Sequence, residues 1–111
     1  MKKVVFIVVA GLFAACSPKL MMPKQSDVES IVAAHPNYNL ADMKEGRQLY
    51  SQHCGTCHAL KSPTSRKEDG WNSIVPIMVK KVNQKGKVAI INQQDSDKIL
   101  QYLVAMSANA K

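Results

Sequence analysis

The sequence has few aromatic residues, few cysteines and no long apolar run. Aromatic residues make up 5% of the 111 residues, and the formal net charge is +7, yet no basic stretch is interleaved with aromatics. This pattern argues against nucleic acid as a partner. The longest apolar run, residues 4–15, would rise about 18 Å as a helix, whereas the hydrocarbon core of a bilayer is about 30 Å thick. A membrane-spanning helix is therefore not expected, and the length leaves room for one folded domain.

The first fifteen residues have the organisation of an export signal. Met1-Lys2-Lys3 is a positive segment, residues 4–15 are apolar, and two small residues precede Cys16. This arrangement predicts a signal peptide over residues 1–15 and a mature protein that is exported to the periplasmic side of the membrane.

Residues Leu12-Phe13-Ala14-Ala15-Cys16 resemble the lipobox of bacterial lipoproteins. The resemblance implies cleavage before Cys16 and acylation of that cysteine, so that lipid chains anchor the protein in the inner or outer membrane. Phe13 stands where the lipobox usually has Leu, and ordinary signal-peptide cleavage near the same place remains the alternative. Residues 16–25 hold two prolines and no periodic apolar pattern, and they are predicted to be a lipidated tether for a domain over residues 26–111.

The run Cys54-Gly55-Thr56-Cys57-His58 is the most specific motif in the sequence. Two thiols three residues apart can each add to a vinyl group of haem, while the adjacent imidazole ligates the iron. A thioredoxin-like thiol pair would need a surrounding βαβ pattern, which the sequence lacks. A zinc site would need further ligands, and only His35 and His53 remain. We predict one covalent haem c held by Cys54, Cys57 and His58, which leaves Cys16 for lipid and no thiol for a disulfide.

Helix signals follow one another along the rest of the chain. A capping box begins at Ser26, and Asn39 can cap a second helix that runs up to the cysteines. Pro76 is expected to distort or restart a short third helix, followed by a basic loop over residues 80–87. Residues 88–91 could pass for a strand, but the sequence offers no partner strand. We predict an all-α domain with helices over 26–34, 39–53, 71–79 and from Asp95 or Ser96 onward.

Beyond the haem motif, residues 40–106 resemble the small class I cytochromes c, whose iron has His and Met ligands. Gly46 and Tyr50 lie eight and four residues before Cys54, and the run Ile99-Leu100-Gln101-Tyr102-Leu103 lies near the C-terminus. In that family the glycine and the aromatic residue of the first helix pack against aliphatic and aromatic residues of the last helix. The resemblance implies a cytochrome c-like fold of about three to five helices wrapped around one haem, in which Gly46 lets two backbones approach closely.

The resemblance also implies a methionine as the second axial ligand, and Met78 is our prediction. It ends the Trp-containing segment 70–78, which is similar to the segment that ends in the axial methionine of compact family members. Met106 is expected on the apolar face of the last helix, where methionine usually fills core. His53 is tethered too closely to Cys54 to reach the far face of the haem, whereas His35 leaves bis-His ligation open. Lysines near the motif are further candidates. A thioether ligand predicts a comparatively high redox potential.

Two further residues are predicted to support the haem and its ligands. Pro63 follows His58 by five residues, and its carbonyl is a candidate acceptor for the imidazole N–H, a bond that would orient the ring. Trp71 can donate its indole N–H to a haem propionate, or it can form a wall of the haem pocket.

With both axial positions filled, the predicted function is single-electron transfer and not catalysis. Without the two lysines of the signal peptide, the 15 basic residues fall to 13 against 8 acidic ones, so the mature chain carries a formal +5. This charge favours a redox partner with an acidic docking surface. Four lysines that follow Met78 can steer such a partner, or they can simply form a solvated loop: Lys80, Lys81, Lys85 and Lys87. The alternative is a haem-based binder of small ligands with a weak or absent sixth ligand. The donor, the acceptor and the oligomeric state stay open.

Overall fold

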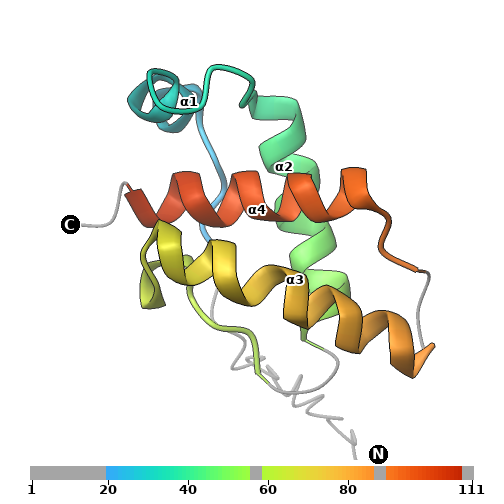
Figure 1. The fold of residues 1–111 in the computed structure, drawn as a ribbon. Helices are drawn as coiled ribbons and strands as arrows, with labels where there is room; N and C mark the ends of the chain where they lie inside the picture. The colour runs from blue at the N-terminus through green and yellow to red at the C-terminus, as the bar shows by residue number, and fades with distance from the viewer. Residues whose placement is uncertain (1–19, 56–58, 87–89, 109–111) are drawn as a thin grey trace, which may run out of the picture.

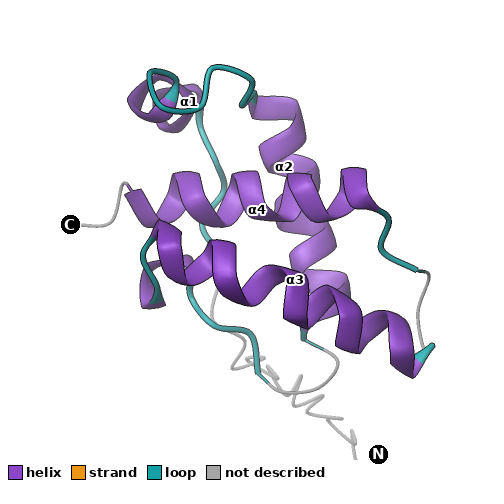
Figure 2. Ribbon diagram, in the orientation of Figure 1, coloured by secondary structure: helices purple, strands orange, loops and turns teal. Residues whose placement is uncertain are grey.

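The computed structural model describes residues 20–55, 59–86 and 90–108, which form a helical domain (Figure 1; Figure 2). These ranges contain helices and loops but no strand, so the all-α prediction is confirmed for them. None of the described helices is long and apolar enough to cross a membrane. The elements are α1 (Gln25–Ile31), α2 (Leu40–Leu49), a π-helical turn (Tyr50–Cys54), a 3-10 helix (Pro63–Ser65), α3 (Glu68–Lys85) and α4 (Gln93–Ala108).

Helix α4 lies at the centre of the domain. It packs against α1, α2, α3 and the 3-10 helix. In Figure 1 it crosses α2 steeply, while α3 runs beside it. Full burial of a large apolar side chain stabilises a fold by about 1.5–3 kcal/mol, and α4 buries six residues: Ile99, Tyr102, Leu103, Val104, Ala105 and Met106.

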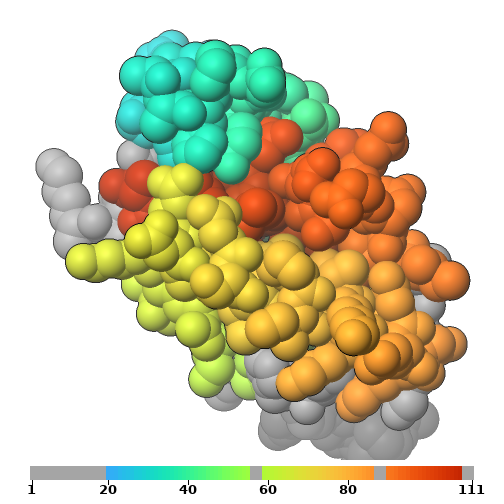
Figure 3. Space-filling view, in the orientation of Figure 1, coloured from blue at the N-terminus to red at the C-terminus, as the bar shows by residue number. Residues whose placement is uncertain are grey.

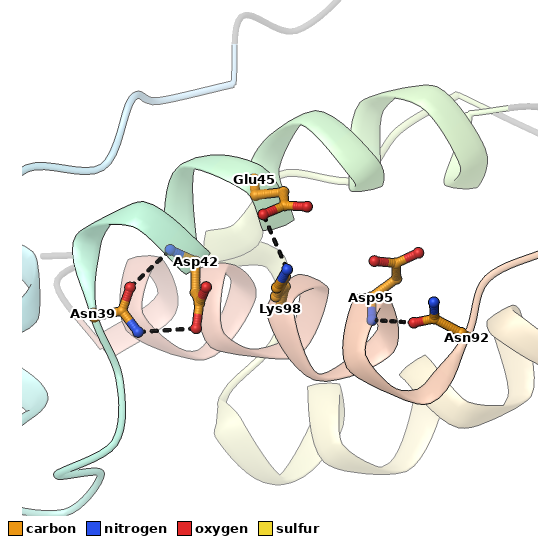
Figure 4. A network of polar contacts seen from close by, with 6 residues as sticks. All are labelled: Asn39, Asp42, Glu45, Asn92, Asp95 and Lys98. Carbon is orange, nitrogen blue, oxygen red and sulfur yellow. Dashed lines mark hydrogen bonds and ion pairs between the residues drawn. The ribbon is translucent and has the colours of Figure 1, made fainter.

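The backbones of α2 and α4 come closest at Gly46. A Cβ atom added there would lie 2.5 Å from the carbonyl carbon of Lys98 and 3.1 Å from Ile99 N, both of which belong to the α4 backbone. Beside this crossing, Lys98 Nζ forms an ion pair with Glu45 Oε2 at 3.0 Å (Figure 4). The prediction that Gly46 lets two helix backbones approach closely is confirmed.

Three aromatic side chains fill the space between α2, α3 and α4. Tyr50, Trp71 and Tyr102 are each at most 2% exposed. The rings of Tyr50 and Trp71 meet edge to face, with their centroids 6.2 Å apart, an arrangement that aromatic quadrupoles favour. The predicted core positions of Tyr50 and Tyr102 are confirmed.

Asparagine side chains cap the N-termini of the two crossing helices, α2 and α4. Asn39 Oδ1 accepts a hydrogen bond from Asp42 N at 2.9 Å, as expected for the cap of α2 (Figure 4). Asn92 Oδ1 accepts from Asp95 N at 2.8 Å in the same way. Because Asn92 is the cap, α4 begins at Gln93, earlier than the start at Asp95 or Ser96 that the sequence predicted.

Helix α3 is longer than predicted. It begins at Glu68, continues through Pro76 and ends at Lys85, so residues 80–85 are helical and the predicted basic loop is wrong over this range. Proline removes one backbone hydrogen bond, whereas lysine and glutamine favour helix. The stop signal is Gly86, whose φ of 60° is the left-handed conformation that commonly follows a helix.

The segment Leu20–Lys24 packs on the domain, which corrects its assignment to a tether. Arg47 donates from Nη2 and Nε to Leu20 O at 3.1 and 3.3 Å, and the Tyr102 hydroxyl donates to Met21 O at 2.8 Å. Leu20 and Pro23 are buried. The folded domain therefore includes residues 20–25, which were predicted to lie outside it, while residues 1–19 lie outside the described ranges.

Helix α1 packs against α4, at the top of Figure 3. It begins at Gln25 and ends at Ile31, so it is shorter than the predicted 26–34. Asp27 caps it by accepting from Lys24 N at 2.7 Å. After a turn, His35 Nε2 lies 2.6 Å from Glu68 Oε1, a contact that joins this region to the first turn of α3.

Candidate haem-binding site

Cys54 ends the helical segment that begins with α2. After Leu49 the helix continues as the π-helical turn Tyr50–Cys54, and single π-helical turns occur frequently at functional sites. His53 and Cys54 are 7% and 6% exposed, whereas Ser51 and Gln52 face solvent. The turn therefore directs the first cysteine of the haem motif into the protein.

A cavity of about 460 Å³ lies beside Cys54, within the range of about 300–1,000 Å³ that is usual for small-molecule and cofactor sites. One wall is a face of α3, because the lining residues of this helix recur at three- and four-residue spacing. The continuation of α3 past Val79 supplies the second half of this wall. The residues that line the cavity are Cys54, Lys61, Arg66, Ile74, Ile77, Met78, Lys81, Val82, Gln84 and Lys85.

Met78 lines this cavity together with Cys54, from which it is separated by 24 positions in the sequence. The rival histidines and the rival methionine do not line it, whereas the lysines Lys61, Lys81 and Lys85 do. His35 contacts Glu68 and stacks on Tyr38 with ring centroids 4.4 Å apart, and Met106 lines a different hollow, beside Leu20–Lys24. His53 is buried next to Cys54 but does not line the cavity either. The fold thus brings the predicted thiol and the predicted thioether to one space.

The cavity has a cationic border. Lys61, Arg66, Lys81 and Lys85 line it, and no acidic side chain does so among the described lining residues. The guanidinium carbon of Arg66 lies 5.8 Å from the Trp71 ring centroid, within the range of a cation–π contact. Sequence reasoning missed Lys61 and Arg66, because they lie in a polar segment without periodicity that was predicted to be loop.

Two hydrogen bonds from buried rings hold the segment that follows the haem motif. The Tyr50 hydroxyl donates to Lys61 O at 2.7 Å, and Trp71 Nε1 donates to Pro63 O at 2.8 Å. The two predicted roles of Trp71 were donation to a haem propionate and a wall of the haem pocket. In the structure the acceptor is Pro63 O, and Trp71 does not line the cavity. A buried indole N–H needs a partner within reach. The second lone pair of the Pro63 carbonyl remains for the predicted bond to His58.

Burial sets the protonation of both core tyrosines. It raises the pKa of Tyr50 to about 12, and the nearby Cys54 adds to this rise. Burial likewise raises the pKa of Tyr102 to about 12, against the opposing charge of Arg47. Both hydroxyls therefore stay protonated at neutral pH and remain hydrogen-bond donors.

We expect Trp71→Phe to lower the free energy of unfolding by about 1–3 kcal/mol, because the buried Pro63 carbonyl loses its donor while most ring packing is kept. Urea denaturation followed by far-UV circular dichroism measures the change. Ser51→Ala is the matched control. It removes an exposed bond from Ser51 Oγ to Gln48 O and should change the free energy by less than about 0.5 kcal/mol. Equal stability of Trp71→Phe and Ser51→Ala would contradict the role of the indole.

Cys57 and His58, two of the predicted haem ligands, lie outside the described residues, as does Cys16. The residues that are described fit the predicted group, because a thiol, a thioether, aliphatic side chains and cationic groups surround one cavity of suitable size. A haem presents the matching features, namely a vinyl-bearing apolar ring, an iron and two carboxylates. Comparisons with protein-family models, with curated proteins and with solved structures gave no match.

Proposed function

We propose that the protein is a monohaem c-type cytochrome that transfers single electrons at the periplasmic side of a membrane, where lipid chains on Cys16 anchor it. Cys54 and Cys57 attach the haem, and His58 and Met78 are the axial ligands. The observation that carries the proposal is the shared cavity of Cys54 and Met78. Cys54 belongs to the haem motif, and Met78 is the candidate sixth ligand. They are 24 positions apart in the sequence, yet both line the same cavity.

A cytochrome c-like fold is part of the proposal. Its support is the steep crossing of α2 and α4 at Gly46. The core aromatic residues are Tyr50, in the π-helical turn that continues α2, and Tyr102 on α4. This is the packing that the resemblance to class I cytochromes c implies for the first and last helices.

The residues around the cavity have distinct roles in electron transfer. The bound haem supplies a one-electron ferric/ferrous couple, and axial Met ligation favours the ferrous state relative to a second imidazole. Ile74, which is partly buried, and Val82, which is buried, limit access of water, which lowers the reorganisation needed when the charge changes. With His58 and Met78 both occupied as ligands, no side chain is needed as an acid, a base or a nucleophile.

Purification from native membranes tests the attachment. We expect a red protein whose colour stays with the polypeptide after extraction with acidified acetone, because thioether bonds resist this treatment. The Cys54→Ser, Cys57→Ser double variant should lose the colour into the solvent or fail to acquire it. A colourless wild-type protein with titratable thiols at Cys54 and Cys57 would refute the haem and would favour a thiol oxidoreductase.

Lysines at the cavity border provide the proposed docking surface for an acidic redox partner. Lys81 and Lys85 lie one turn apart on α3 and both line the cavity, and Lys80 is exposed beside them. Clustered charge of one sign raises the rate of encounter with an oppositely charged partner by about 10- to 1,000-fold at low ionic strength. The partner is thus expected to approach the haem edge at the C-terminal half of α3.

We expect Lys81→Glu to slow electron exchange with a small acidic flavoprotein by about tenfold at low salt and to flatten the dependence of the rate on ionic strength. Stopped-flow absorbance of the haem measures the rate. Lys44→Glu on α2 makes the same change in net charge at an exposed position that does not line the cavity. If the two variants slow the reaction equally, net charge and not docking at the cavity is responsible.

A further inference from the structure

The packed segment Leu20–Lys24 limits how far the domain can lie from the lipid on Cys16. Only residues 17–19 separate that cysteine from Leu20, whose carbonyl is held by Arg47. At roughly 3.3–3.6 Å per residue, four residue steps reach about 14 Å at most. The surface around Leu20 must therefore stay within that distance of the anchored lipid.

The surface within this reach is apolar with basic neighbours. Met21 and Met22 are 48% and 53% exposed, the largest exposed fractions of bulky apolar side chains near this end of the described chain. They line a hollow of about 560 Å³ together with Leu20 and Met106. Lys24 and Arg47 border the same hollow, with Asp27 as the acidic residue among them.

Hydrogen bonds fix the backbone of Leu20–Lys24, whereas the side chains of Met21 and Met22 are exposed to solvent. Pro23 is buried, and Tyr102 binds the carbonyl of Met21. A segment that were only a spacer would have no need of these contacts. Methionine adapts its shape readily to irregular apolar surroundings, and a basic group near the surface of anionic lipid adds electrostatic attraction.

We propose that the face formed by Met21, Met22 and Lys24 lies against the lipid headgroups of the membrane that holds Cys16. This inference rests on the lipid anchor of the proposed function. The domain then has one preferred orientation at the membrane, set by the hydrogen bonds of Arg47 and Tyr102, and does not swing on a long tether. Acyl chains alone attach the protein to the membrane, whereas this second contact fixes the orientation of the domain relative to the membrane surface.

Polarity-sensitive fluorophores on single introduced cysteines test the contact in the full lipidated protein. The two labelling sites are Met22→Cys and, as a control, Ile90→Cys, and the protein is reconstituted in vesicles that contain phosphatidylglycerol. Ile90 is 73% exposed and lies just before the start of α4. Met106, which lines the hollow, lies near the end of this helix. Because a 16-residue helix is about 24 Å long, position 90 lies at the opposite end of α4 from the hollow. We expect a blue shift and loss of iodide quenching at position 22, together with quenching by lipid-borne nitroxide, and full iodide quenching at position 90. Equal iodide quenching at both positions would overturn the proposal.

Two further measurements test the lipid anchor and the haem separately from the contact with the membrane. The mass of the mature N-terminus reports acylation of Cys16, and an unacylated chain overturns the anchor and the membrane face together. Labelling of the parent protein reports whether Cys54 and Cys57 are free, which tests the haem without affecting the contact. The Arg47→Gln, Tyr102→Phe variant loses the hydrogen bonds that fix Leu20 and Met21. When it is labelled at position 90, its energy-transfer distances to an acceptor lipid should be broadly distributed. The same label on the protein with Arg47 and Tyr102 intact should give a narrow distribution. Equally broad distances in both proteins would also contradict a fixed orientation.

Discussion

We expect Gly46→Ala to lower the free energy of unfolding by about 3 kcal/mol or more, at the upper end of what overpacking usually costs. The added methyl group would meet the carbonyl group of Lys98 and the nitrogen of Ile99, all of which are backbone atoms. A side chain could rotate away, but a helix backbone can only move as a unit. The crossing of α2 and α4 must therefore open, which exposes side chains that are now buried, such as Met43 and Ile99. With a total stability of about 5–15 kcal/mol in ordinary domains, this loss is a large fraction.

The matched control for this substitution is Gly70→Ala, which adds the same methyl group in α3. There the nearest atom is Cβ of the exposed Arg66 side chain at 3.2 Å. Alanine is favoured over glycine in a helix by about 1 kcal/mol, so Gly70→Ala should be neutral or slightly stabilising. Urea denaturation of both variants, followed by far-UV circular dichroism, gives the comparison. A Gly46→Ala midpoint equal to that of the parent would mean that the close approach of α2 and α4 is absent in solution.

We expect Met78→Ala to remove the methionine-to-iron charge-transfer band and to lower the redox potential. Alanine cannot ligate iron, and the neutral, soft thioether is the group that favours the ferrous state. The reduced variant should also bind CO rapidly, because one axial position is then open. Met78 lies midway along the wall that α3 contributes to the cavity, so the substitution truncates a partly buried side chain and leaves the helix intact.

Two other substitutions distinguish ligation from packing. Met106→Leu changes a buried methionine outside the cavity and should keep both the band and the potential. Met78→His should lose the band and lower the potential, yet keep CO out, because an imidazole can take the vacant position. A charge-transfer band that persists in Met78→Ala would eliminate this methionine as the ligand. Rapid CO binding by the parent protein would favour a small-ligand binder over an electron carrier.

The parts of the fold that were predicted correctly have a signal in side-chain type and spacing. Asn39 is a residue that caps helices, and Tyr50 falls on the apolar face of its helix, so these two roles follow from the residues themselves. The close approach at Gly46 and the core position of Tyr102 were expected from the resemblance to class I cytochromes c. The proximity of Met78 to Cys54 was reached by resemblance and is consistent with the cavity that both residues line.

The parts that were missed depend on backbone acceptors, which every residue has. Leu20 O, Met21 O and Pro63 O receive hydrogen bonds from side chains 8 to 81 positions away. Nothing in the residues that supply these carbonyls marks them as partners, so Leu20–Lys24 was assigned to a tether. The length of α3 was missed for another reason. Pro76 was predicted to interrupt the helix, and the lysines after Met78 were predicted to lie in a loop. In the structure the helix ends only at Gly86.

Helix α4 follows in sequence all the elements that it packs against, which has a consequence for when the domain folds. Under the proposed export, with the N-terminus first, residues 20–55 would emerge before Tyr102 and Lys98, whose atoms contact Met21 and Gly46 in the fold. Helix α2 has ten residues, and so short a helix is marginal in water without packing. Under this proposal the domain would stay open until α4 has emerged. During that interval Cys54, which is buried in the finished fold, would be within reach of the enzymes that attach the proposed haem, so the order of emergence itself would provide the time for the attachment.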